Sequence, residues 1–392
     1  MSPRILLLSA SVGTGHNRAA EAIHLALAQL CPEAHLEYAD VLDDTNRAFR
    51  RVYGRGYFGL VDMAPHVVGY LYDRLDQPVK RPRVERMRLS LSMLNLQRLV
   101  DRITRTNWDL VICTHFLPAE VVSRLRISGK VNCAQAVVTT DFDTHRLWVN
   151  SPCERYFVAT EEGRLNLAAW GVDHDDIAVT GIPIHPSFAE FKSPVECRHR
   201  HGLGTDRPIV LQMAGGSGFG PVEKVHRALL DVTVPLEIVS VCGRNPTIGA
   251  ELEQIPCPPR HRRRVIGFTR QIDELMAAAD VVVSKPGGLT ASESLARGAA
   301  MLIVEPIPGQ ETRNSDFLLE NGAAVKVNNL ASLAHKLTAM LTEPRRLDDL
   351  RGNARRVARP HAAFDVAAQC LDLIRVPVAR QRTIEPRVPV AR

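Results

Sequence analysis

The stretch RILLLSASVGTGHNRAAEAIHLALAQL, residues 4–30, decides the fold of the N-terminal half. A short apolar run beginning at Ile5 leads into a loop that contains Gly13 and Gly15, and a helical pattern follows. Strand, glycine loop and helix in this order open a βαβ unit, in which helices cover a parallel sheet. The loop is therefore expected over the carboxyl ends of the strands, where the first turn of a helix presents free N–H groups.

The glycine loop does not follow either of the common nucleotide-binding patterns. Arg18 stands where the dinucleotide fingerprint has its third glycine, and no Gly-Lys-Ser/Thr follows as in a P-loop. His16 ends the loop, and a histidine there can take a proton near neutral pH. The alternative is that His16 only caps the helix. Both interpretations stay open on the motif alone.

Outward from this unit, short apolar runs alternate with helical patterns along most of the chain, which predicts an α/β fold with two Rossmann-like, doubly wound domains. The predicted strands lie near 4–9, 35–39, 109–114, 132–138, 155–159, 177–181, 208–213, 236–242, 264–267, 281–284, 301–304 and 325–327. The predicted domains are 1–190, with an insertion at 41–108, and 191–374, followed by a disordered basic tail at 375–392.

Composition places the chain among ordinary globular proteins, with 392 residues, 45% hydrophobic, 23% charged and a net charge of +6. This charge is too small to indicate a nucleic-acid partner. The eight cysteines are scattered without C-x-x-C spacing, which favours reduced thiols over a zinc site or disulfides. The apolar run at 5–8 is too short for a signal peptide, and no run of about 18–20 apolar residues predicts a membrane span.

The positive charge is concentrated in two places. Residues 47–105 hold 13 Lys and Arg against 5 Asp and Glu, together with four of the six tyrosines. Within this segment, 84–103 has the apolar spacing of an amphipathic helix. The last 18 residues carry five arginines and one glutamate and contain VPVAR twice, with no function that the sequence indicates.

A second glycine loop follows the first predicted strand of the second domain. It reads GGSGFG at 215–220 and includes Gly216 and Ser217. Two such loops, one opening each half, predict two Rossmann-like domains that face each other. A flexible surface loop is the alternative.

The stretch VVVSKPGGLTASESLARG at 281–298 has the features of an anion site. A buried strand ends at Lys285, and a helix begins after Gly287 and Gly288, near Leu289 and Thr290. Backbone N–H groups at such a helix start can hold a diphosphate, and the helix dipole contributes about 0.3–2 kcal/mol. One turn further, Glu293 can accept both hydroxyls of a ribose. After the next strand, Gln310 and Glu311 offer groups for sugar hydroxyls, although Glu311 alternatively caps its own helix.

Three separated motifs now resemble a known family. The segments SASVGTGHNRAAEAI at 9–23, VVTTDFDTHRLW at 137–148 and KPGGLTASESLARG with PGQETRN at 285–314 are similar to the monogalactosyldiacylglycerol synthase and diacylglycerol glucosyltransferase branch of glycosyltransferase family 28. The resemblance covers roughly residues 4–374. It implies a GT-B fold with a central cleft, inversion at the anomeric carbon, a UDP-sugar donor and no metal or other cofactor.

The resemblance also assigns residues. It places donor-binding groups at Gly216, Ser217, Phe268, Lys285, Gly287, Gly288, Leu289, Thr290, Glu293, Gln310, Glu311 and Asn314. It places acceptor-binding groups at Gly13, Gly15, His145 and Trp148, with His16 facing the acceptor. Plant members tend to have GGGH where this chain has Gly13-Thr14-Gly15-His16, so acceptor identity is not carried over.

Two carboxylates complicate the assignment of a base. Asp141 and Asp143 form a D-x-D, which binds a divalent metal in another glycosyltransferase fold. The nucleotide motifs lie in the other half, which favours Asp141 as an acceptor-side group. Asp141 is then a rival of His16 as catalytic base, or its orienting partner.

The leading hypothesis is therefore transfer of a hexose from a UDP-sugar to a membrane lipid such as diacylglycerol. The protein would act in the cytoplasm, bound peripherally to the anionic inner face of the cell membrane. The alternatives are an N-acetylglucosaminyl transferase with an isoprenoid-linked or soluble acceptor, a UDP-sugar epimerase of the same fold, and a non-catalytic UDP-sugar sensor. The sequence does not decide the donor sugar, the acceptor, the number of sugars added or the oligomeric state.

Overall fold

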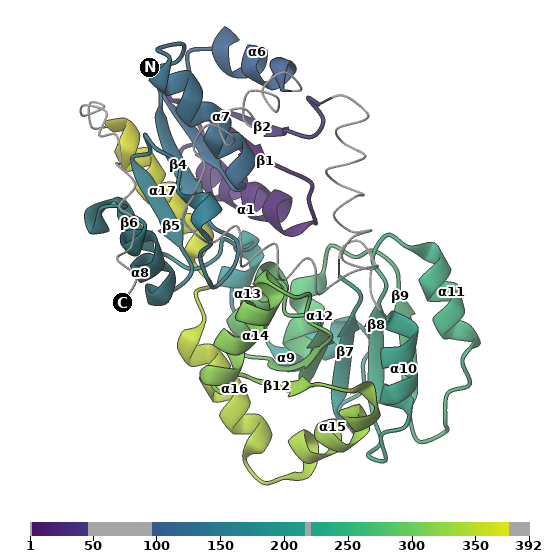
Figure 1. Cartoon of the computed structure of the whole chain (residues 1–392). Helices are drawn as coiled ribbons and strands as arrows, with labels where there is room; N and C mark the ends of the chain where they lie inside the picture. The colour runs from purple at the N-terminus through teal and green to yellow at the C-terminus, as the bar shows by residue number, and fades with distance from the viewer. Residues whose placement is uncertain (1, 46–95, 216–220, 376–392) are drawn as a thin grey trace. The chain divides into compact units, whose positions relative to one another are not determined.

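The computed structural model describes residues 2–45, 96–215 and 221–375. These residues divide into two compact units, one from 2–186 with 361–375 and one from 187–360 (Figure 1). Most of the predicted insertion at 41–108, nearly all of the tail at 375–392, and Gly216 and Ser217 lie outside the described residues. Of the helix predicted at 84–103, the described part appears as α6 (Gln97–Arg105).

The first unit is built on a six-stranded sheet in the order β2-β1-β3-β4-β5-β6, and its neighbouring strands pair in parallel. The strands are β1 (Arg4–Ser9), β2 (His35–Asp40), β3 (Leu110–Cys113), β4 (Ala134–Val138), β5 (Arg155–Val158) and β6 (Ile177–Val179). On β1, Leu6 and Leu8 enter one apolar core, whereas Ile5 and Leu7 enter the core on the opposite face. Because both faces are covered, the strand is an unbroken apolar run, as the sequence predicts.

Helices cover both faces of this sheet. They are α1 (Gly15–Leu30), α6, α7 (Phe116–Ile127), α8 (Glu161–Ala169) and α17 (Ala362–Arg375), and a short 3₁₀ turn, η2 (Arg146–Trp148), also belongs to this unit. The first helix buries Ile23 and Leu27 against the sheet. Its start at Gly15 fixes the end of the glycine loop directly above the carboxyl end of β1.

The last helix differs from the predicted domain limits. Helix α17 contributes Val366, Ala367, Cys370 and Leu371 to the same apolar core as α1, and therefore lies in the first unit. The predicted C-terminal domain extended to residue 374, but the second unit ends at residue 360. The physical reason is the apolar face of α1, which α17 covers.

The second unit contains a six-stranded sheet of the same kind, in the order β12-β11-β10-β7-β8-β9, again with parallel pairings. Its strands are β7 (Ile209–Met213), β8 (Glu237–Val241), β9 (Arg262–Ile266), β10 (Val281–Ser284), β11 (Ala300–Val304) and β12 (Ala324–Val327). Its helices are α9 (Pro194–Arg200), α10 (Val222–Leu230), α11 (Pro246–Gln254), α12 (Ile272–Ala278), α13 (Gly288–Ala296), α14 (Gln310–Glu320), α15 (Leu333–Thr342) and α16 (Arg346–Val357). Both sheets confirm the predicted two Rossmann-like domains.

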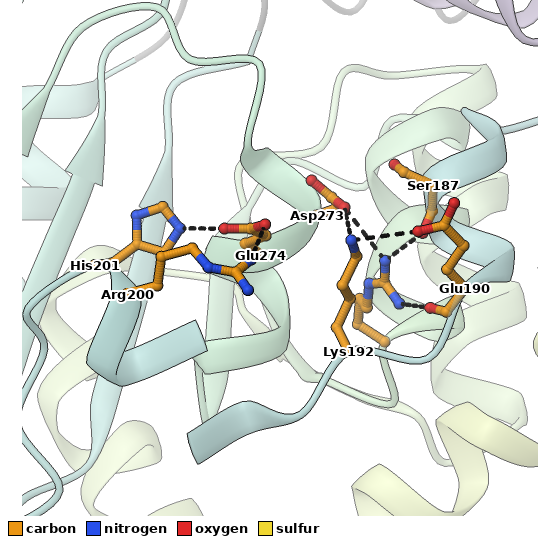
Figure 2. Close-up of polar contacts among 8 residues, drawn as sticks. Ser187, Glu190, Lys192, Arg200, His201, Asp273 and Glu274 are labelled. Atoms are coloured by element: carbon orange, nitrogen blue, oxygen red, sulfur yellow. Dashed lines mark hydrogen bonds and ion pairs between the residues drawn. The ribbon is translucent and has the colours of Figure 1, made fainter. Parts of the chain in front are cut away.

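A buried ion-pair network fastens the first residues of the second unit. Arg297, which follows α13, donates to the carbonyl oxygens of Ser187 and Glu190, both at 2.6 Å. Its guanidinium also lies 3.5 Å from the carboxylate of Asp273 on α12, which Lys192 approaches to 3.8 Å (Figure 2). A buried guanidinium requires such acceptors. The segment 187–192 is thereby held to the C-terminal end of α13.

The eight cysteines are all free thiols, and six of them are buried. Within the described residues, no helix combines the length and apolar character needed to cross a membrane.

Candidate functional site

The residues predicted to lie on the acceptor side gather where the strand order of the first sheet reverses. The chain runs from β1 to β2 on one side and then returns to place β3 on the other side of β1. In open parallel sheets, ligands bind outside the carboxyl ends of the strands at such a switch point. The glycine loop follows β1 here, and Thr114 follows β3.

His16 spans this switch point. It lies in the first turn of α1, after Thr14 at the N-cap position, and its ring reaches across to β3. Its Nδ1 lies 3.0 Å from the carbonyl oxygen of Thr114 and 2.8 Å from the hydroxyl of Thr140, which follows β4. Because a carbonyl oxygen only accepts hydrogen bonds, Nδ1 carries the proton and Nε2 keeps the lone pair. The His16 ring thus connects three strand ends.

Burial sets the charge of this ring. Desolvation lowers the pKa of His16 to about 4, against the opposing effect of the hydrogen bond to the Thr114 carbonyl. His16 is therefore neutral at pH 7, with an acceptor nitrogen available. A neutral imidazole with its second nitrogen held by a carbonyl has the form that a general base needs.

A second histidine, which sequence reasoning missed, lies against His16. The rings of His16 and His115 are 4.7 Å apart between centroids and nearly perpendicular, at 89°. His115 directly follows the β3 segment and caps α7, where its Nδ1 accepts the N–H of Leu117. Trp148 lies 6.2 Å from His16 and 6.4 Å from His115, between ring centroids. A histidine just after a buried strand was the signal that could have identified His115.

The predicted acceptor-side motif 137–148 lies partly in this cluster. Trp148 is buried in it, as the contacts above show. Asp141 is the neighbour of Thr140, which bonds His16. His145 is buried, and its Nδ1 accepts the N–H of Leu147, so its own proton is on Nε2.

Asp143, the other member of the D-x-D, makes hydrogen bonds within its own loop and to α8. Its Oδ1 accepts the N–H of Thr144 at 2.7 Å and the side-chain amide of Asn166 at 2.6 Å. Among the described residues, no three or more His, Cys, Asp or Glu side chains are grouped so that they could hold a metal ion.

The donor-side residues lie at the equivalent point of the second sheet. Its order places β10 beside β7, so the segment after β10 is at the switch point. Gly287 is the N-cap of α13 and has no side chain to bond the first-turn N–H groups. These N–H groups point outward from the N-terminal end of the helix, and Lys285 lies two residues before the N-cap. The arrangement suits a phosphate or diphosphate.

Glu293 and the loop after β11 flank this helix start. Glu293 lies in the second turn of α13 and is 3% exposed. The Oε2 of Glu311 accepts the N–H of Ile307 at 2.7 Å, a bond to the loop before α14 and not to an N–H of the helix itself. A Cβ placed on Gly287 would lie 3.7 Å from the Oε1 of Glu311, so the two loops are neighbours.

The remaining predicted donor residues are distributed around these loops. Leu289 and Asn314 are buried, whereas Thr290 and Gln310 are partly exposed. Gly309, before Gln310, has a φ of 99°, a conformation that glycine adopts without strain.

An exposed aromatic ring lies at the end of β9. Phe268 is 52% exposed, and the guanidinium of Arg244 lies 5.0 Å from its ring centroid. Arg244 follows β8, the neighbouring strand, and sequence reasoning did not select it. A guanidinium over an aromatic face is a favourable cation–π pair. Both residues therefore lie beyond the carboxyl ends of two neighbouring strands.

Comparisons with known proteins show which proteins the chain as a whole resembles. Residues 16–184 match the model of the family monogalactosyldiacylglycerol (MGDG) synthase, and residues 257–357 match that of glycosyl transferases group 1. A processive diacylglycerol β-glucosyltransferase of Bacillus pumilus is 28% identical over 92% of this chain and 92% of its own length. The chain is a glycosyltransferase. The predicted resemblance is confirmed.

Solved structures agree on the fold of this glycosyltransferase. MurG of Acinetobacter baumannii aligns with a TM-score of 0.62 at 17% identity, covering 94% of this chain and 99% of MurG. HepE of Anabaena, in complex with UDP-glucose, aligns with a TM-score of 0.56 at 14% identity, covering 94% and 99%. The glycosyltransferase therefore has the GT-B fold that the resemblance implied.

Proposed function

We propose that this glycosyltransferase transfers a hexose from a UDP-sugar to a membrane lipid of the diacylglycerol type, with inversion at the anomeric carbon and without a metal ion. The observation that carries the proposal is the neutral His16, held by the Thr114 carbonyl with Nε2 as acceptor. The name of the Bacillus pumilus relative supports diacylglycerol as acceptor and glucose as the sugar. The UDP-glucose complex of HepE supports the donor class.

The proposed reaction is an in-line displacement. A hydroxyl oxygen of the acceptor forms a bond to the anomeric carbon, and its proton passes to Nε2 of His16. The bond between the anomeric carbon and the diphosphate oxygen breaks, and UDP leaves with the electron pair. The first-turn N–H groups of α13 and the ammonium of Lys285 stabilise the negative charge that develops on the diphosphate. Asp141, next to Thr140, is the rival base in this scheme.

The donor side uses the second unit. Glu293 accepts hydrogen bonds from the ribose hydroxyls, and Gln310 and Asn314 lie near the sugar and phosphates. The flat surface of Phe268 and Arg244 suits a uracil ring, because stacking on an aromatic face contributes about 1–3 kcal/mol per base.

The test of the function is an assay of purified protein with UDP-galactose, UDP-glucose and UDP-N-acetylglucosamine, each with vesicles that contain diacylglycerol. We expect a glycolipid product from a UDP-hexose, with a β-linkage if the reaction inverts. The same assay in excess EDTA should retain its rate, because the helix start and Lys285 take the place of a cation. Transfer only to an isoprenoid-linked acceptor, epimerisation of the donor without an acceptor, or complete loss in EDTA with rescue by Mn²⁺ would each contradict part of the proposal.

Association with the inner face of the cell membrane belongs to the same proposal, since a lipid acceptor remains in the bilayer. The insertion at 41–108, in which residues 47–105 are basic and tyrosine-rich, is the proposed docking surface, and most of it lies outside the described residues. Arginines attract anionic headgroups at about 1 kcal/mol each, and tyrosines can lie at headgroup level.

Replacement of Arg81, Arg83, Arg86 and Arg88 with serine should reduce co-sedimentation with anionic vesicles. Binding of the parent should also weaken with salt, because exposed charges are screened over about 10 Å at 0.1 M. Neutral vesicles serve as the control. If the variant sediments like the parent, the aromatic residues of the segment serve the domain core, and the basic tail at 375–392 becomes the docking candidate.

A further inference from the structure

The immediate surroundings of His16 contain a feature that proton transfer alone does not explain. Three rings meet it or each other at close range: His115, Phe116 and Trp148. The hydrogen bonds of the His16 ring both involve Nδ1, on one edge of the ring. Rotation of the ring about the Cβ–Cγ bond, which sets the direction of Nε2, is also restricted by the side chains that pack against the ring.

His115 has the geometry to supply that constraint. Its ring stands at 89° to the His16 ring at 4.7 Å, an edge-to-face arrangement that aromatic rings favour. His115 is itself immobile, because it is 2% exposed and its Nδ1 accepts the N–H of Leu117 at 3.0 Å. Its ring also packs on Phe116, with centroids 4.2 Å apart. The immobile His115 ring therefore restricts rotation of the His16 ring about its Cβ–Cγ bond.

The protonation state of His115 fits this function. Burial, and next the neighbouring His16, hold the pKa of His115 well below its usual value. His115 therefore stays neutral when His16 receives a proton, and no second positive charge opposes the transfer. Its Nδ1 accepts a backbone N–H, so its own proton is on Nε2.

We propose that His115 is a positioning residue, which holds the His16 ring in one orientation and shields one side of it from water by edge-to-face packing. The activity part of this proposal rests on the proposed function, whereas the packing part does not. The acidic, basic and histidine side chains on α1, on α7 with its cap, and on the segment 139–148 are Arg18, Glu21, His24, His115, Glu120, Arg124, Arg126, Asp141, Asp143, His145 and Arg146. Among them, His115 is the residue whose ring lies against the His16 ring, with centroids 4.7 Å apart.

Two substitutions distinguish the effect of the His115 ring from the effect of its hydrogen bond to the Leu117 N–H. His115→Asn keeps an acceptor for the Leu117 N–H, since asparagine is a favoured N-cap residue, but removes the ring. His115→Phe keeps the ring and removes the acceptor. His174→Asn, at an exposed histidine of the same unit, is the matched control.

The primary measurement is the NMR titration of the His16 ring in the full-length protein. In H115N, the His16 midpoint should rise from about 4 by roughly one unit toward 6.5, because water reaches the ring. The kcat should fall about tenfold with an unchanged KM for the UDP-sugar, because the base is misaligned and the donor site is not. In H115F, the His16 midpoint should stay near that of the parent and the loss of kcat should be smaller. Its melting temperature should fall by about 2–4 °C, because the cap is lost.

The outcomes that overturn the proposal are distinct from failure of the proposed function. An unchanged His16 titration in H115N, or an equal shift in H115F and H115N, refutes positioning by the ring. If H115N does not fold, H115F decides the question alone. This variant keeps an aromatic ring at position 115, so a raised midpoint of the His16 titration in H115F would contradict the proposal. Full activity of a His16 variant would instead refute His16 as the base and leave the titration result to stand by itself.

Discussion

Replacing His16 with alanine should slow sugar transfer by about 10²–10⁴-fold, the range typical for loss of a general base. The reason is the neutral ring, whose Nδ1 proton is held by the Thr114 carbonyl and whose Nε2 is the acceptor. The affinity for UDP should remain near that of the parent, because the proposed donor residues lie in the other compact unit. Steady-state kinetics and calorimetric titration with UDP measure the two quantities.

The control and the rival are both available in the chain. His174→Ala, at an exposed histidine of the same unit, should leave the rate unchanged. Asp141→Asn tests the competing base. If this variant is crippled and H16A is not, the proton goes to Asp141, and His16 becomes a structural residue of the glycine loop.

The pH profile follows from the same environment. Because burial lowers the pKa of His16 to about 4, the base stays unprotonated as the pH falls from 7 to about 5. The acid limb of kcat/KM that belongs to His16 should therefore lie near pH 4 and not near 6.5. A limb near 6.5 would mean that His16 titrates as an ordinary exposed histidine.

Replacing Glu293 with alanine should weaken UDP binding by about 10²-fold or more. A carboxylate that accepts two ribose hydroxyls makes two charge-assisted hydrogen bonds, each contributing about 1.5–3 kcal/mol. Because Glu293 is 3% exposed, truncation also leaves space in α13, so Glu293→Gln is the better-packed companion variant. Isothermal calorimetry with UDP gives the affinity, and thermal unfolding checks the fold.

Glu320→Ala is the matched control, since Glu320 is exposed at the end of α14. Its UDP affinity should equal that of the parent. Unchanged UDP binding in both Glu293 variants would remove Glu293 from the donor site, and the ribose contact would then have to come from another group near the α13 helix start.

The strands were the most predictable part of the molecule. Runs such as VVVS at β10 and LVIC at β3 are buried on both faces, so their apolar character is continuous and bounded by loop residues. The two-domain organisation was predicted from the two glycine loops, because each loop follows the first strand of its sheet. Strand order, by contrast, comes from which helix covers which face, and no local pattern contains it.

The site was predictable only in part. His16 was found because it ends a glycine loop, whereas His115 stands in CTHFLP without a motif around it, and only the pairing of β1 with β3 brings the two rings together. Arg244 was missed for the same reason, since its contact with Phe268 joins the ends of two neighbouring strands. The bond from Glu311 to the Ile307 N–H was not predicted, because it joins the side chain to the loop before α14 and not to the helix start.

The position of α17 affects how this protein can be synthesised and divided. Residues 187–360 form one continuous stretch that contains all strands of the second sheet, so the second unit can form its sheet as soon as this stretch has left the ribosome. The first unit depends on a later part of the chain, because Ile23 and Leu27 of α1 share their apolar core with α17, which is translated after the whole second unit. A single cut at residue 186 would therefore yield an N-terminal fragment with an open apolar surface. A fragment of this half fit for isolated study would have to join residue 186 to residue 361 by a short linker.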